Sequence, residues 1–204
     1  MREEIILYHG SKNIVESPEI RVTKYNKDFY FGFYCTTLDA QAKRWATRFD
    51  GKGILNEYRY TPNEELSVKV FPEMSEEWLD FIVACRSGKS HNYDIVEGPM
   101  ANDTIFNYVQ NFVDGKISRE AFWDLARFKK PTHQISFHTA KSLTTLKFLK
   151  YGYRNPTGFR RWVKVAKSGG LCYTCVMGTC KSKTDTSICY STILFSYASI
   201  ERNC

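Results

Sequence analysis

The chain has 204 residues, 43% of them hydrophobic and 15% aromatic, which is enough to bury the core of one compact domain. Its net charge of +7 is unevenly placed: the first 150 residues hold 21 basic and 20 acidic side chains, whereas the last 54 hold eight basic and two acidic ones. The nearly neutral main part gives no reason to expect a long binding track for a polyanion such as nucleic acid there.

The start of the chain carries no sign of a membrane segment. The apolar run Ile5–Tyr8 follows two acidic residues and is too short for a signal peptide. No segment approaches the roughly 18 consecutive apolar residues of a membrane-spanning helix. We therefore expect a cytoplasmic protein that has no membrane among its partners.

The predicted elements begin with a strand over Ile5–Tyr8, which ends in the triplet His9-Gly10-Ser11. A glycine at the tip of a strand lets a ligand approach the main chain closely. The imidazole and the hydroxyl on either side of it offer hydrogen bonds to the same space. The triplet is therefore a candidate binding site for a flat ring that carries an amide.

An aromatic segment, Asp28–Thr36, comes next and is interrupted by Gly32, which suggests a turn that faces a ligand. The pattern after it predicts a helix from about residue 38 to 49, capped by Thr36 or Thr37.

Within this predicted helix, Gln41, Trp45 and Phe49 recur at helical spacing and form one stripe. We therefore expect Trp45 to face inward, and the spacing leaves both core packing and ligand contact open for it.

The rest of the first 150 residues mixes strands and helices. We predict strands at 53–60, 66–71, 93–96 and 133–138, and helices from Ser75 to about Gly88, at 104–113, at 118–127 and at 140–149. The loop at 98–103 ends in Asn102 and Asp103, which serve as a helix cap or as a recognition element. Because the order lacks the regular alternation of a parallel sheet, we expect an α+β fold.

The last predicted strand, His133–His138, carries a further candidate. A period of two places Gln134, Ser136 and His138 on one face of that strand. Gln134 thus lines a surface opposite Ile135 and Phe137, or it satisfies a neighbouring backbone group.

The remaining residues, 151–204, differ in composition from the rest. Five of the seven cysteines lie there, at Cys172, Cys175, Cys180, Cys189 and Cys204. Their spacing is similar to a zinc knuckle, but it lacks a second Cys-x2-Cys pair and any later histidine, so we predict no metal site. We divide the chain into a domain at 1–150 and a basic, Cys-rich, loosely ordered extension at 151–204. Translation beyond an ancestral reading frame is the alternative origin.

Taken together, the triplet at His9, the Gly-x-Tyr at Gly32–Tyr34, the aromatic Trp45 and the strand at Gln134 resemble the ADP-ribosyltransferase superfamily of the diphtheria-toxin and poly(ADP-ribose) polymerase type. Residues 1 to about 150 look like an uncharacterised bacterial branch of that superfamily, known as domain of unknown function 3990. The segment Tyr93–Asp103 looks typical of this branch.

The resemblance implies an α+β fold with a split antiparallel β-sheet core and flanking helices, and it implies a role for each matched residue. His9 would bind a ribose hydroxyl of NAD, and Gly10 and Ser11 would bind the nicotinamide amide. Tyr34 and Trp45 would stack on the two faces of the nicotinamide ring.

The main departure from the family pattern is Gln134, which stands where the superfamily has a catalytic glutamate. A glutamine supplies the hydrogen bond to ribose but not the charge that stabilises an oxocarbenium-like transition state. Asp103 or Glu97 could supply that charge instead, as could an anionic acceptor.

The resemblance implies a mono-ADP-ribosyltransferase that moves ADP-ribose from NAD to a protein or nucleic-acid target. It also implies a toxin of a toxin-antitoxin pair, neutralised by a small antitoxin protein. Two alternatives stay open: an NAD glycohydrolase, and a catalytically weak or inactive module that binds NAD or ADP-ribose.

Overall fold

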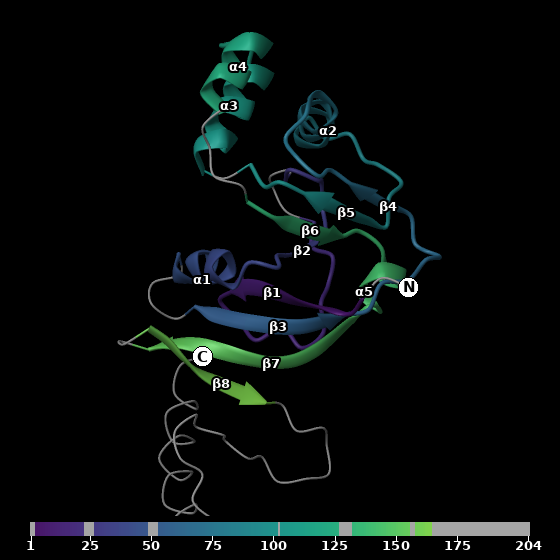
Figure 1. The fold of residues 1–204 in the computed structure, drawn as a ribbon, viewed down its shortest axis with the longest axis vertical. Helices are drawn as coiled ribbons and strands as arrows, with labels where there is room; N and C mark the ends of the chain where they lie inside the picture. The colour runs from purple at the N-terminus through teal and green to yellow at the C-terminus, as the bar shows by residue number, and fades with distance from the viewer. Residues whose placement is uncertain are drawn as a thin grey trace, which may run out of the picture.

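The computed structural model describes residues 3–22, 27–48, 53–101, 103–126, 132–155 and 158–164. Its elements are β1 (Ile5–Ser11), β2 (Phe33–Cys35), α1 (Asp39–Thr47), β3 (Ile54–Tyr60), β4 (Val68–Val70), α2 (Glu76–Arg86), β5 (Ile95–Gly98), α3 (Asp103–Val113), α4 (Arg119–Ala126), β6 (Gln134–Phe137), α5 (Ala140–Leu143), β7 (Leu146–Asn155) and β8 (Gly158–Lys164) (Figure 1). The described residues form an α+β fold with two mostly antiparallel sheets and five helices, which confirms the predicted fold class.

The two sheets have four strands each. The first has the order β1-β3-β7-β8 and is antiparallel throughout. The second has the order β2-β6-β5-β4, in which β4 and β5 run parallel. A bridge joins β1 to the second sheet, because the backbone groups of Tyr8 and Thr36 exchange hydrogen bonds of 2.8 and 3.0 Å. This bridge brings the end of β1 beside β2.

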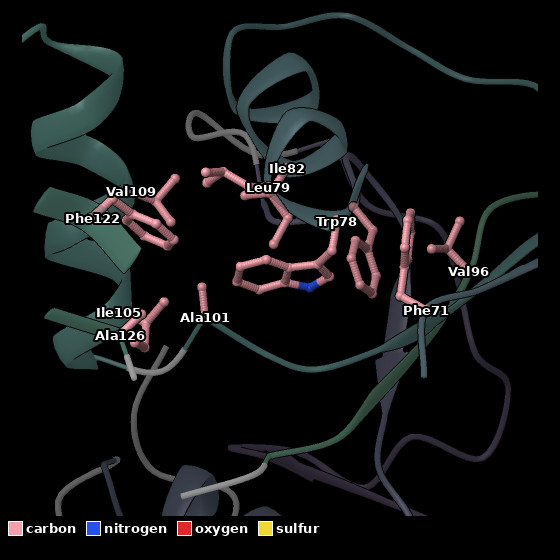
Figure 2. Packing of buried hydrophobic residues seen from close by; sticks show 11 residues of the cluster. Phe71, Trp78, Leu79, Ile82, Val96, Ala101, Ile105, Val109, Phe122 and Ala126 are labelled. Atoms are coloured by element: carbon pink, nitrogen blue, oxygen red, sulfur yellow. The ribbon is translucent and has the colours of Figure 1, made fainter. Parts of the chain in front are cut away.

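Two apolar clusters hold these layers together. One combines residues of both sheets, among them Leu7, Phe33, Tyr58 and Phe137. The other joins the second sheet to α2, α3 and α4, and Figure 2 shows Trp78 of α2 between that sheet and the two later helices. The indole nitrogen of Trp78 donates to the carbonyl oxygen of Pro99 at 3.0 Å, which fixes the loop after β5.

The predicted start of α2 at Ser75 is confirmed, because the Ser75 hydroxyl caps the helix by accepting a hydrogen bond from the Trp78 backbone. The start of α1 differs from the prediction. Leu38 is its N-cap residue and makes no side-chain cap bond, while the Thr36 hydroxyl accepts from the Leu38 backbone just before the helix. Trp45 was expected to face inward, but it is 39% exposed. The inward position on α1 belongs to Gln41, which is buried, and Phe49 lies outside the described residues.

The predicted helix over 140–149 is wrong. A Thr139 capping box starts α5, but the helix ends at Leu143, and β7 then pairs with the free edge of β3. Lys and Leu favour a helix locally, yet pairing along β3 decides the conformation. β7 crosses residue 150, where we divide the chain, and β8 continues the sheet to Lys164. Residues 165–204 lie outside the described part of the chain.

The glycine of the His9 triplet has a structural reason of its own. A Cβ added to Gly10 would lie 2.2 Å from the carbonyl oxygen of Ala42 and 2.8 Å from the backbone nitrogen of Ala46. The backbone of α1, rather than a ligand, thus makes the close approach that this glycine permits.

We therefore expect Gly10→Ala to push α1 away from β1 and to lower the free energy of unfolding by about 1–3 kcal/mol or more. Urea unfolding checks this, with Lys12→Ala at an exposed position as the control, for which we expect a change within about 0.5 kcal/mol. Equal stability of the two variants would contradict the close contact.

Candidate functional site

One cavity, of about 800 Å³, collects five of the residues that the sequence singled out: His9, Gly10, Tyr34, Trp45 and Gln134. They come from β1, β2, α1 and β6, so up to 125 positions of sequence separate them. The volume is within the usual range of roughly 300–1,000 Å³ for sites that hold small molecules or cofactors.

His9 presents a hydrogen-bond acceptor to this cavity. Its Nδ1 lies 2.6 Å from the carbonyl oxygen of Tyr34, which can only accept, so Nδ1 carries the proton. Burial lowers the pKa of His9 to about 4, which keeps the ring neutral at physiological pH. Nε2 is therefore an unprotonated acceptor, and it has no protein partner among the described residues.

Tyr34 is held rigidly in the cavity wall. Its hydroxyl donates to the carbonyl oxygen of Tyr30 at 2.6 Å and accepts from the backbone nitrogen of Phe29 at 3.1 Å. Burial raises the pKa of this hydroxyl well above its usual value. Tyr30 has a φ of +69°, a strained conformation for a residue with a side chain, and the bond from Tyr34 helps to hold it.

Trp45 lies at the rim of the same cavity. The Arg48 guanidinium lies 4.0 Å from the centre of the Trp45 ring, so this cation already contacts the indole. Because the indole is partly exposed, it is accessible to a ligand in the cavity.

Gln134 does not point its amino group into the open cavity. Its Nε2 donates to Asp28 Oδ2 at 3.1 Å and to the carbonyl oxygen of Pro99 at 3.3 Å. Asp28 is in turn paired with Arg86, whose Nε and Nη2 lie 3.1 and 2.5 Å from Oδ1. Asp28, Arg86 and Gln134 thus form a buried polar cluster in the cavity wall, and the backbone nitrogen of Ala101 completes it at 2.9 Å from Oδ2.

Ser11 does not line the cavity with its two neighbours. Its hydroxyl accepts from the buried Asn56 side chain at 3.0 Å and donates to the carbonyl oxygen of Asn13 at 2.6 Å. These contacts tie the end of β1 to β3. Of the loop candidates, Asn102 lies outside the described residues, as does the side chain of Asp103.

A second polar group braces the strand before Gln134. His133 Nε2 pairs with the Glu97 carboxylate at 3.0 Å, and the buried Gln41 donates to the His133 carbonyl oxygen at 2.6 Å. Glu97 is thus bound to His133 and is not part of the cavity lining.

Lys27 adds a cation to the cavity. Its ammonium lies 4.7 Å from the centre of the Tyr34 ring and has no carboxylate partner among the described residues. Burial lowers its pKa, which is the sign of a charge that has lost part of its water. An anionic group of a ligand would be a favourable partner for it.

Asp28, Arg86 and Lys27 line the cavity although no motif in the sequence marks them as functional. Asp28 and Arg86 stand 58 positions apart, and no local pattern connects them. The one local clue is the adjacent pair of charges Lys27-Asp28, which directly precedes the aromatic run Phe29–Phe31.

No cluster of three or more side chains suited to a metal ion occurs within the described ranges, and the cysteines after residue 165 fall outside them. None of the helices in the described part of the chain is long and apolar enough to cross a bilayer.

Comparison with known proteins gives one match. Residues 5–148 match the model of a protein family that is described as 'protein of unknown function (DUF3990)'. No curated protein and no solved structure matches the chain. The matched span contains the whole cavity lining and most of the chain. The chain therefore belongs to the DUF3990 family of proteins of unknown function.

Proposed function

We propose that the protein is an NAD-dependent mono-ADP-ribosyltransferase that acts on a macromolecular target. The observation that carries this proposal is the meeting of His9, Gly10, Tyr34, Trp45 and Gln134 at one cavity. The resemblance implies a nicotinamide or ribose contact for each of them, although up to 125 positions of sequence separate them.

The properties of the lining support NAD as the ligand. The fixed acceptor Nε2 of His9 suits a ribose hydroxyl, and the Tyr34 and Trp45 rings suit an aromatic amide such as nicotinamide. Lys27 suits a phosphate. The Tyr34 and Trp45 rings would hold the nicotinamide in place while its bond to ribose breaks.

Incubation with labelled NAD and cell lysate tests the transferase directly. We expect label on a protein or nucleic acid, and we expect His9→Ala and Trp45→Ala to remove most of it. Labelling by both variants at the wild-type level would contradict the site assignment.

One observation favours a second candidate, a module that binds NAD or ADP-ribose with little or no catalysis. Asp28 is the only carboxylate among the described residues that line the cavity, and Arg86 neutralises it. Saturable NAD binding without nicotinamide release would select this module, whereas nicotinamide release without a labelled acceptor would select a glycohydrolase.

The role of Lys27 gives a prediction on ligand choice. We expect Lys27→Met to weaken NAD binding about tenfold, because a charge-assisted bond to phosphate is lost, and to leave the affinity for free nicotinamide unchanged. Calorimetry measures both affinities. Lys43→Met, at a lysine that pairs with Asp39 outside the cavity, is the control and should bind NAD normally. An equal loss for NAD and nicotinamide would argue against a phosphate contact.

The proposal includes the toxin role that the resemblance implies. Induced expression of the wild-type protein should arrest growth, and expression of the His9→Ala variant should not. Growth arrest by both proteins would show that toxicity does not depend on this cavity.

A further inference from the structure

The two hydrogens of the Gln134 amide are both committed to groups that can only accept. Their nitrogen, Nε2, lies 3.1 Å from Asp28 Oδ2 and 3.3 Å from the Pro99 carbonyl oxygen and donates to both. A flipped amide would set its carbonyl oxygen against these two oxygens, so the network allows one orientation. The remaining polar atom, Oε1, has no protein partner among the described residues.

Asp28 is itself fixed from three sides. Arg86 of α2 holds Oδ1 through two nitrogens, and the Ala101 backbone and the Gln134 amide hold Oδ2. The residue is 7% exposed, and each of its oxygens accepts two hydrogen bonds. Asp28 is therefore a support for Gln134 rather than a group that binds ligand directly.

We propose that Asp28 is a positioning residue that fixes the carbonyl oxygen of Gln134 as the ligand-facing atom, so that the site recognises its ligand through hydroxyl donors. The inference rests on the proposed function in one respect, since it takes the hydroxyls to be those of the nicotinamide ribose of NAD. His9 follows the same logic, because the Tyr34 carbonyl oxygen fixes its Nε2 as an acceptor. Both groups accept hydrogen bonds and neither donates one to the ligand.

Ligand analogues test this polarity in the full chain. Fluorine in place of a ribose hydroxyl keeps size and weak acceptor character but removes the donor. We expect wild-type protein to bind at least one of the 2′- and 3′-fluoro analogues about five- to tenfold more weakly than NAD. Equal or tighter binding of both analogues would overturn the proposal.

Variants connect the effect to Gln134. We expect Gln134→Met to bind NAD more weakly than wild type and to lose the preference for hydroxyl over fluorine at one ribose position. Lys43→Met, at a lysine that pairs with Asp39 outside the cavity, is the control and should keep both the wild-type affinity and the preference for hydroxyl. A Gln134→Met protein that discriminates as wild type does would assign the hydroxyl to another residue.

A measurement that needs no ligand isolates the role of Asp28. The side-chain amide protons of Gln134, identified in an NMR spectrum by their loss in Gln134→Met, should exchange with solvent at least tenfold more slowly than those of Gln110. Asp28→Asn should remove this protection, and in the wild-type protein rapid exchange at Gln134 would by itself overturn the positioning role. Slow exchange together with no NAD binding would instead contradict the proposed function and leave the role of Asp28 standing.

Discussion

Gln134→Glu is expected to destabilise the protein, and the loss should grow as the pH rises. The substitution replaces an amino group that donates to Asp28 and to the Pro99 carbonyl oxygen with a carboxylate oxygen at the same position. Three acceptors then face one another in a buried wall, and two carboxylates that lie about 3 Å apart cannot both ionise without a large cost.

How the stability of Gln134→Glu depends on pH follows from the protonation state of the new carboxyl group that the folded protein favours. The folded protein favours the protonated acid at position 134, so its folded-state pKa lies above the unfolded value of about 4.3. Stability is then retained below that unfolded value and is lost as the pH rises through the folded-state pKa, by about 1.4 kcal/mol for each unit of difference.

Urea unfolding between about pH 4 and 8 measures this loss, with Gln134→Met as the neutral control. We expect the gap between the two variants to widen toward high pH. A gap that stays constant would show that no second carboxylate lies near position 134. The neighbouring Asp28 carboxylate thus disfavours a second carboxylate at position 134.

Arg86→Met should be among the most damaging substitutions outside the apolar core. It leaves the buried Asp28 carboxylate without its cation, and losing one partner of a buried ion pair costs about 3–5 kcal/mol. The side chains of Arg86 and Asp28 are 4% and 9% exposed, so the pair lies in the buried regime where this cost applies.

Arg119→Met supplies the matched control. Arg119 pairs with Glu76 and Asp80 on the surface of the helical layer, and such exposed pairs contribute at most about 1 kcal/mol. In equilibrium unfolding, Arg86→Met should therefore lose several-fold more free energy of unfolding than Arg119→Met. Similar losses would contradict a buried pair at the cavity.

The order of helices and strands was largely predictable because it depends on the local spacing of apolar residues. The strand predicted over 53–60 and the helix predicted from Ser75 to about Gly88 agree closely with β3 and α2. The segment after Ala140 was not predictable in this way, because β7 forms on the edge that β3 offers, and that edge exists only in the folded sheet.

The residues of the candidate site also differ in how far local sequence predicts them. His9, Tyr34 and Trp45 could be selected because each has a recognisable position next to a strand or on a helix. The orientation of Gln134 could not, since it depends on Asp28 and on Arg86, far away in sequence. The packing role of Gly10 could not be predicted either, because it depends on the contact of α1 with β1.

NAD binding, measured by calorimetry for the wild type and for Trp45→Ala, tests the central claim most directly. Trp45 is partly exposed, so its removal should leave stability within about 1 kcal/mol while it removes a ring from the cavity. Leu38→Ala, at the start of the same helix, is 44% exposed and lies outside the lining, which makes it the control. We expect saturable binding by the wild type, an affinity about tenfold lower for Trp45→Ala and no change for Leu38→Ala. A wild-type protein that does not bind NAD, or a Trp45→Ala protein that binds it equally well, would contradict the account.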